Sequence, residues 1–247
     1  MDPRNFDMKS NFQIGDQSVT DSRTFVANVF SWMFFALALT AATAWYFADS
    51  GMIKYLFTNT MSDTGIRPSM NILGWVVMLA PLGFVIALSA GIQRFSAITM
   101  TILFVLFSII MGMSFSFILL AYTGSSIALT FVTTSVMFGV MAIAGYTTKS
   151  DLTKMGSLLS MALIGIIVAM VINAFMHSAL IDYIISIIGV IIFTGLTAYD
   201  VQKIKRIGEQ ATEAEMTKKL TIYGALTLYL DFINLFLFLL RIMGGRK

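Results

Sequence analysis

Seven long apolar blocks, separated by polar stretches, make up most of this chain of 247 residues. Each block holds about twenty residues, the length at which an α-helix crosses a bilayer core of roughly 30 Å. Residues 1–24 are polar and are predicted to form an N-terminal tail, and residues 25–243 a seven-helix transmembrane domain. The predicted membrane-spanning helices cover residues 25–48, 71–93, 97–121, 126–147, 157–176, 180–201 and 221–242.

The polar connections between these blocks differ in length. Those at residues 92–97, 122–126 and 177–181 are very short, so we expect the helices that they join to pack antiparallel. Residues 49–70 are expected to form a polar loop. Residues 202–220 are expected to form a charged loop, in which EQATEAEMTKKL predicts a short surface helix.

Small residues recur at every fourth position of several blocks. Such spacing lines one face of a helix and lets two backbones approach closely, which is typical of a compact membrane bundle. The residues are Ala36, Thr40, Ala44 and Ala48 in the first block, Gly83, Ala87 and Gly91 in the second, Ser108, Gly112 and Ser116 in the third, and Gly165 and Ala169 in the fifth.

The composition supports a membrane protein and narrows its chemistry. Hydrophobic residues make up 57% of the chain and charged residues 12%, whereas soluble domains have about 25% charged residues. The net charge of +3 comes from residues at helix ends rather than from one cluster, so we expect no nucleic-acid partner. The chain has no cysteine and a single histidine, His177, which excludes disulfides, thiolate metal sites and a bis-histidine haem. No cofactor is expected.

Lysine and arginine predict how the chain is oriented in the membrane. Eleven of the sixteen lie in the tail and in the second, fourth and sixth connections, and such an excess of positive charge marks the cytoplasmic side. The N-terminus is therefore expected in the cytoplasm. Seven full crossings place the C-terminus outside, whereas a re-entrant last helix would return it. The last block is long enough to cross, which favours seven crossings.

Asp231 lies about eleven residues into the last apolar block, near the middle of the membrane at ~1.5 Å per residue. A carboxylate there costs on the order of 3 kcal/mol, and intramembrane acids usually face the bundle interior and mark function. Its neighbours at three- and four-residue spacing include Gly224, Thr227 and Asn234. They form a narrow stripe of small and polar residues that must face inward. Thr227 and Asn234 are therefore candidates to support a pore or gate.

Asp200 lies closer to the surface, about 9 Å below Arg206 at the helical rise. By itself it also fits an interfacial acid paired with Lys203 or Lys205. If Asp200 and Asp231 meet, they cannot both ionise cheaply in a low dielectric, and they titrate as one unit.

A proton shared between the two acids would tie their helices together, and its loss would set like charges against each other. Such an element is a pH-biased latch. The ionised pair would also offer oxygen ligands to calcium. Calcium takes about 6–8 oxygens, so that only a transient site is expected.

Asn173, His177 and Asp182 are the other polar residues that fall near the predicted outer surface. Such residues commonly cap helices at the interface, and lining an outer vestibule is the alternative.

Two stretches carry a resemblance to a known family. LTAYDVQKIK (residues 196–205) and LTLYLDFINLFLFLLRI (residues 226–242) resemble the two characteristic segments of the Bax inhibitor family of membrane proteins. The second block, MLAPLGFVIALSAG (residues 78–91), and the helix count extend the likeness over the whole chain. FVANVFSWM, after the polar tail, is similar to the bacterial branch.

The resemblance implies an all-α fold in which six helices surround a central C-terminal helix. It implies that Asp200 and Asp231 form a pH-sensing gate for calcium leak across a bacterial inner membrane. Some members instead restrain a membrane-bound AAA protease. In a relative, a basic residue near the end of the second helix bonds to the first aspartate. Gly91 stands there in this chain, and Arg94, one turn further on, is the candidate for that role.

An intramembrane aspartyl protease is the sharpest enzyme alternative, because the pair Tyr199–Asp200 matches half of its motif. Its second aspartate follows Gly-x-Gly, whereas Asp231 follows Leu-Tyr-Leu, and half a motif is a weak signal. A retinal protein needs a lysine in its last helix, which this chain lacks after Lys219. A proton-coupled transporter stays an alternative, because buried acids also serve as proton relays. Such a protein normally has broken helices or paired halves, and the sequence indicates neither.

We therefore expect a non-enzymatic, pH-sensitive calcium leak protein gated by Asp200 and Asp231, with Tyr199 beside the first of them. The serious alternative is an interaction protein that binds and restrains a protease, with the polar tail as the place where a partner is held.

Overall fold

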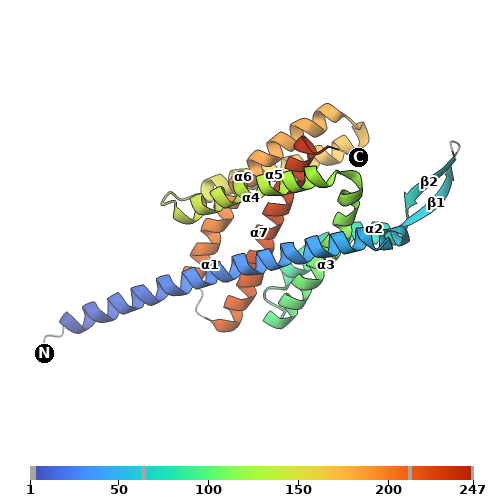
Figure 1. The fold of residues 1–247 in the computed structure, drawn as a ribbon. Coiled ribbons are helices and arrows are strands. Elements are labelled where there is room, and N and C mark those ends of the chain that lie inside the picture. The colour runs from blue at the N-terminus through green and yellow to red at the C-terminus, as the bar shows by residue number, and fades with distance from the viewer. Residues whose placement is uncertain (1–3, 63–64, 211–212, 246–247) are drawn as a thin grey trace.

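The computed structural model describes residues 4–62, 65–210 and 213–245, and its dominant elements are seven α-helices (Figure 1). Each contains a stretch long and apolar enough to cross a membrane. The protein is thus an all-α integral membrane protein, as the apolar blocks predict. The helices are α1 (Arg4–Asp49), α2 (Ile72–Gly91), α3 (Ala97–Ala121), α4 (Gly124–Thr147), α5 (Thr153–Met176), α6 (Ala179–Gln210) and α7 (Ala214–Met243).

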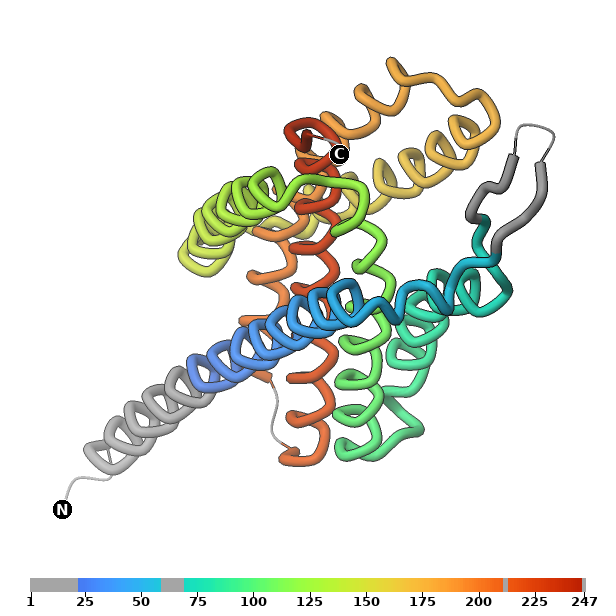
Figure 2. Tube along the Cα trace, turned by 45° about the vertical axis from the view of Figure 1, so that its right-hand side comes forward, coloured from blue at the N-terminus to red at the C-terminus, as the bar shows by residue number. Residues whose placement is uncertain are grey.

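Helix α7 lies at the centre of the bundle. In its most apolar stretch 61% of the residues are buried, against 6% to 39% in the other six helices. It contacts α1, α3, α4 and α6 extensively and α2 marginally, and Figure 2 shows it running through the middle of the molecule. Helix α5 is the least buried and packs mainly against α6. The central position of α7 explains why it can carry a carboxylate at mid-membrane.

The stripes of small residues in α1 and α3 form the closest crossing of the bundle. A Cβ atom on Gly112 would come within 2.6 Å of the Thr40 carbonyl oxygen, so the two backbones touch where these residues meet. The Thr40 hydroxyl donates to the Ser108 carbonyl oxygen across this contact, at 2.9 Å. By contrast, a Cβ on Gly83 of α2 or Gly165 of α5 would meet no atom within 4 Å, so these two glycines serve no tight packing.

Both ends of α7 are tied to the ends of α3. At one end the Ala97 amide donates to Glu215 Oε1 at 2.7 Å. At the other end the Thr123 amide donates to the Gly245 carbonyl oxygen at 3.1 Å, and the Gly245 amide donates to Ser126 Oγ at 2.9 Å. Helix α7 therefore crosses the same thickness as α3. This geometry supports a seventh full span over a re-entrant helix.

Residues 49–70 are more ordered than the polar loop expected for them. A 3-10 helix (Met52–Leu56) is followed by an antiparallel hairpin of β1 (Phe57–Ser62) and β2 (Gly65–Met70), which lies beyond the end of α1 in Figure 1. Asn71 joins the 3-10 helix to α2, because its side chain donates to the Tyr55 carbonyl oxygen at 2.7 Å and accepts from the Gly74 amide at 2.9 Å.

Two other boundaries also differ from the predicted ones. Helix α1 begins at Arg4, so residues 4–24 of the predicted polar tail continue the first helix. Helix α6 runs to Gln210 and α7 begins at Ala214. The expected separate surface helix is therefore replaced by extensions of α6 and α7, because polar helix formers continue both helices beyond their apolar stretches.

Candidate functional site

Asp200 on α6 and Asp231 on α7 lie side by side in the interior of the bundle. Their residues are only 9% and 5% exposed, and their carboxyl groups are hydrogen-bonded to each other. A hydrogen bond between two carboxyl groups requires a proton on one of them, because carboxylate oxygens only accept. Among the described residues, no group donates a hydrogen bond to Asp231 Oδ2. The contact can therefore form only while one of the two carboxyl groups carries a proton.

Helix α7 is held so that its polar stripe faces this pair. On its opposite side Tyr229 is fully buried. Its hydroxyl lies 2.8 Å from Thr40 Oγ1, and its ring packs edge-on against Phe107 with centroids 5.2 Å apart. Because Asp231 lies two residues after Tyr229, anchoring the tyrosine toward α1 and α3 turns the aspartate toward α6.

Helix α6 is held by α4 at the level of Asp200. A Cβ atom on Gly145 of α4 would overlap the Ala198 carbonyl oxygen and would lie 2.8 Å from the Ala198 Cα. Only a glycine at position 145 allows the two helices to come this close. Ala198 precedes Asp200 by two residues, so this crossing positions the first carboxyl group.

A cavity of about 450 Å³ opens beside the two carboxyl groups, between α2, α5, α6 and α7. We call it the aspartate cavity. Three of the predicted supporting residues, Tyr199, Thr227 and Asn234, lie on its wall together with Asp200 and Asp231. The other lining residues are Ser89, Ser160, Leu163, Ile167, Met170, Phe193, Leu196, Lys203, Tyr223, Leu226, Leu230 and Phe238.

Thr227 and Asn234 both donate side-chain hydrogen bonds to backbone carbonyl oxygens of α7. The Thr227 hydroxyl donates to the Tyr223 carbonyl oxygen at 3.0 Å, and Asn234 Nδ2 donates to the Leu230 carbonyl oxygen at 2.8 Å. The hydroxyl oxygen and the amide oxygen keep free lone pairs as acceptors. With the two aspartates, they give the cavity a set of oxygen atoms suited to a hard cation.

Lys203 and Lys205 do not pair with Asp200 through a direct contact. Lys203 lies on the cavity wall, close enough to attract Asp200 electrostatically, and its Nζ is 6.0 Å from the centre of the Tyr199 ring. Lys205 instead donates to the Tyr146 carbonyl oxygen at 3.1 Å. The interfacial ion pair considered for Asp200 is therefore replaced by the contact with Asp231.

Arg94 does not join the site. It is exposed in the connection between α2 and α3 and does not line the aspartate cavity. Position 91 offers no space for a longer side chain either, because a Cβ on Gly91 would overlap the Phe95 ring. In this structure the aspartate pair is thus built without a basic residue from α2.

Asn173, His177 and Asp182 border a second cavity, of about 580 Å³, at the other end of α5, α6 and α7. We call it the polar vestibule. Asn173 also caps α5, since its Oδ1 accepts from the Ser178 amide at 3.1 Å. Asp182 pairs with Arg241 of α7 at 3.0 Å. Capping and lining, which the sequence left as alternatives, therefore occur together.

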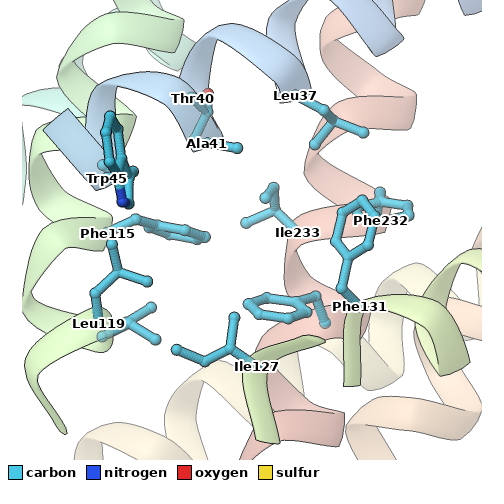
Figure 3. Close-up of a pocket in the computed structure, with 13 residues that line it drawn as sticks. Leu37, Thr40, Ala41, Trp45, Phe115, Leu119, Ile127, Phe131, Phe232 and Ile233 are labelled. Atoms are coloured by element: carbon cyan, nitrogen blue, oxygen red, sulfur yellow. The ribbon is translucent and has the colours of Figure 1, made fainter. Parts of the chain in front are cut away.

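A third cavity is apolar. It holds about 160 Å³ between α1, α3, α4 and α7 (Figure 3). Thr40 is the hydroxyl residue of its lining, and that hydroxyl is already bonded to Ser108 and Tyr229. Phe115, Phe131 and other apolar side chains supply nearly all of the remaining surface. This crevice offers hydrocarbon contact rather than chemistry.

The connection between α4 and α5 contributes contacts that the sequence analysis did not identify. Gln202, two residues after Asp200, accepts from the Leu152 amide at 2.9 Å and donates to the Ser150 carbonyl oxygen at 2.8 Å. Asp151 accepts from the Thr153 hydroxyl at 2.6 Å and from Arg206 at 2.8 Å. These bonds, those to Thr153 first, hold the pKa of Asp151 below its usual range. The signal in the sequence was the polar Gln202 within the motif LTAYDVQKIK.

The bundle of seven apolar helices with α7 buried among the others, and the carboxyl groups paired across α6 and α7, define an integral membrane protein with an intramembrane acidic site. The family model described as "Inhibitor of apoptosis-promoting Bax1" matches residues 22–247. The chain belongs to this Bax inhibitor family.

Relatives in bacteria match nearly the full length of the chain. The inner membrane protein YbhL of Escherichia coli K12 is 47% identical, over 91% of this chain and 93% of the relative. An uncharacterized protein of Borreliella burgdorferi is 40% identical, over 94% and 96%. The uncharacterized protein YrjE of Lactococcus lactis is 35% identical, over 96% and 97%.

Proposed function

We propose that this protein is a pH-sensitive calcium leak channel, which acts without catalysis in a bacterial inner membrane. The observation that carries the proposal is the hydrogen-bonded pair of Asp200 and Asp231, buried at the wall of the aspartate cavity. The YbhL relative, named as an inner membrane protein, supports the membrane assigned. The excess of lysine and arginine supports a cytoplasmic N-terminus, with the C-terminus outside.

The pair acts as a latch because its hydrogen bond needs one proton. When that proton leaves, two negative charges face each other in a low dielectric, and the attraction between α6 and α7 becomes repulsion. The ionised pair then attracts a divalent cation. The other titratable groups on the cavity wall are Tyr199 and Lys203 of α6 and Tyr223 of α7; the lining residues of α2 and α5 bring none. Loss of the shared proton should therefore open the path, so calcium leak should rise with pH.

Calcium would pass through this site without being stored there. Within the described residues, no cluster of three His, Cys, Asp or Glu side chains is placed to hold a metal ion. The two carboxyl groups, the Thr227 hydroxyl and the Asn234 amide offer at most six oxygens, and only if both carboxylates bind through two atoms. They therefore reach no more than the lower limit of the six to eight oxygens of a stable calcium site. Weak coordination is what a conducting site requires, because the ion must also leave.

Calcium influx into liposomes that contain the purified protein, followed from about pH 6 to 8, tests the proposal. The Asp200→Asn and Asp231→Asn variants keep a donor for the remaining carboxylate but cannot lose a proton. We expect each to fold, to leak weakly, and to show no pH dependence. Asp151→Asn, which changes an exposed acid away from the pair, should keep the pH dependence of the parent protein.

No influx above that of empty liposomes, with folded protein confirmed by size-exclusion chromatography, would refute the channel. An influx that falls as pH rises would refute the latch. The first result would leave the binding and restraint of a membrane-bound AAA protease as the function, with the aspartates stabilising the fold. The segment to delete would then be the predicted polar tail, residues 1–24, of which residues 4–24 belong to α1.

A further inference from the structure

The aspartate cavity and the polar vestibule lie end to end along the same three helices. On α7 the residues pass from Asn234 and Phe238 at the first cavity to Arg241 at the second. On α6 they pass from Phe193 at the first cavity to Ser186 at the second. The two cavities therefore follow one line through the bundle, between α5, α6 and α7.

The wall between the two cavities is thin and apolar. Met170 of α5 borders both of them. On α7 Arg241 follows Phe238 by three positions, which is about 4.5 Å at the helical rise. Phe193 and Phe238 are each 5% exposed. On α6 the cavities end at Phe193 and Ser186, seven positions or about 10.5 Å apart. A layer one to two helical turns thick, which contains a methionine and two phenylalanines, therefore divides the two polar spaces.

The Phe238 ring is enclosed by three neighbours. Its ring lies directly against the α6 backbone at Gly189, where a Cβ atom would come within 2.7 Å of the ring. The Phe193 ring lies on the side of the aspartate cavity, with centroids 5.9 Å apart. The Arg241 guanidinium lies on the side of the vestibule, 5.7 Å from the ring centre, and is held there by Asp182 at 3.0 Å. The packing around Phe238 explains why Gly189 and the ion pair of Arg241 with Asp182 occur at this level.

We infer that Met170, Phe193 and Phe238 form a hydrophobic barrier between water in the aspartate cavity and water in the polar vestibule. A narrow apolar layer excludes water and thereby stops ions, although no backbone blocks the way. The latch and the barrier are separate parts of the protein. The aspartates respond to the proton, and the Phe238 ring must move away from Gly189 before a cation crosses. Control of calcium by the barrier rests on the proposed function. The separation of two water-filled cavities by the barrier does not depend on that function.

The absence of cysteine from the chain makes the barrier directly testable. Asn234→Cys places a thiol in the aspartate cavity, and Asn173→Cys places one in the vestibule. Each variant is treated in sealed vesicles with a charged, membrane-impermeant methanethiosulfonate, added from one side or from the other. We expect each thiol to react from one side only, and the two thiols from opposite sides.

Opening the barrier should remove this sidedness. In the Asn234→Cys protein, Met170→Ser or Phe238→Ala should raise labelling from the vestibule side by about tenfold or more, because a charge is disfavoured in an apolar layer by a larger factor than that. Met161→Ser is the matched control, because Met161 lies on the same helix, is 62% exposed and borders neither cavity. This control should leave labelling one-sided.

Labelling of Asn234→Cys from both sides without a barrier substitution would overturn the inference. So would one-sided labelling that persists in both barrier variants, each shown to be folded by size-exclusion chromatography. Met170→Ser keeps the test available if Phe238→Ala does not fold. One-sided labelling without calcium influx would support the barrier and refute the channel. The two proposals can therefore fail separately.

Discussion

The crossing of α4 and α6 at Gly145 is so close that one added methyl group should force the two helices apart. In Gly145→Ala the new Cβ would overlap the Ala198 carbonyl oxygen and would lie 2.8 Å from the Ala198 Cα. Carbon atoms in contact prefer about 3.5–4.0 Å. The two helices must therefore separate by about 1 Å, and neither side of the contact is a flexible side chain that could move instead.

The expected loss of stability follows from this overlap. Forcing an extra methyl group into a packed contact costs about 1–3 kcal/mol, whereas glycine to alanine within a helix gains up to about 1 kcal/mol. The net effect should be a free energy of unfolding lower by about 1–2 kcal/mol. Gly139→Ala is the control, since Gly139 lies on the same helix and its Cβ would meet nothing within 4 Å. That variant should be unchanged or slightly stabilised.

Thermal unfolding of the two variants in detergent, followed by circular dichroism and by the fraction that stays monodisperse, separates these outcomes. Gly145→Ala should melt several degrees below the parent protein, and Gly139→Ala should not. Equal melting temperatures for the two variants would show that the α4–α6 contact is not as close as described. Because Ala198 lies two residues before Asp200, Gly145→Ala should also shift the pH dependence of calcium leak.

Three further predictions concern single groups. Tyr229→Phe removes the hydroxyl that lies 2.8 Å from Thr40 Oγ1, and should lower the free energy of unfolding by about 0.5–1.5 kcal/mol; an unchanged chemical denaturation curve would contradict this. Arg94→Ala should leave the pH dependence of leak unchanged in liposomes, because Arg94 does not line the aspartate cavity, and a flattened profile would show that it reaches Asp200. The bonds of Asp151 to the start of α5 and to Arg206 hold its pKa below the unfolded value, so they stabilise the fold above about pH 4 and are lost as pH falls further. Asp151→Asn should therefore lower the melting temperature at pH 7 and have a smaller effect at pH 2.

The sequence predicted the membrane architecture well because the governing signal is local. A run of about twenty apolar residues specifies a span by itself, and spacing of three and four residues identified the inward stripe of Thr227, Asp231 and Asn234. The extra order in residues 49–70 was not predicted, because strands as short as these carry too little hydrophobic periodicity to be distinguished from a loop.

Contacts between distant segments could not be predicted in the same way. Tyr229 meets Thr40 across 189 residues, and nothing near either residue signals the other. The position of Arg94 depends on how α2 sits beside α6, which one sequence does not specify. The barrier could not be predicted either. In the sequence Met170, Phe193 and Phe238 do not differ from other apolar residues of a membrane span, and only the packing of three helices brings them together.

The buried position of α7 has a consequence for how the protein is made. Helix α7 leaves the ribosome after the other six spans have been synthesised, and chains begin to organise from the N-terminal side during synthesis. Until α7 enters the membrane, the inward faces of α1, α3, α4 and α6 have no centre to pack on. Completion of the bundle therefore waits for its seventh span, and a nascent chain stalled before α7 would present six helices for quality-control proteases to remove.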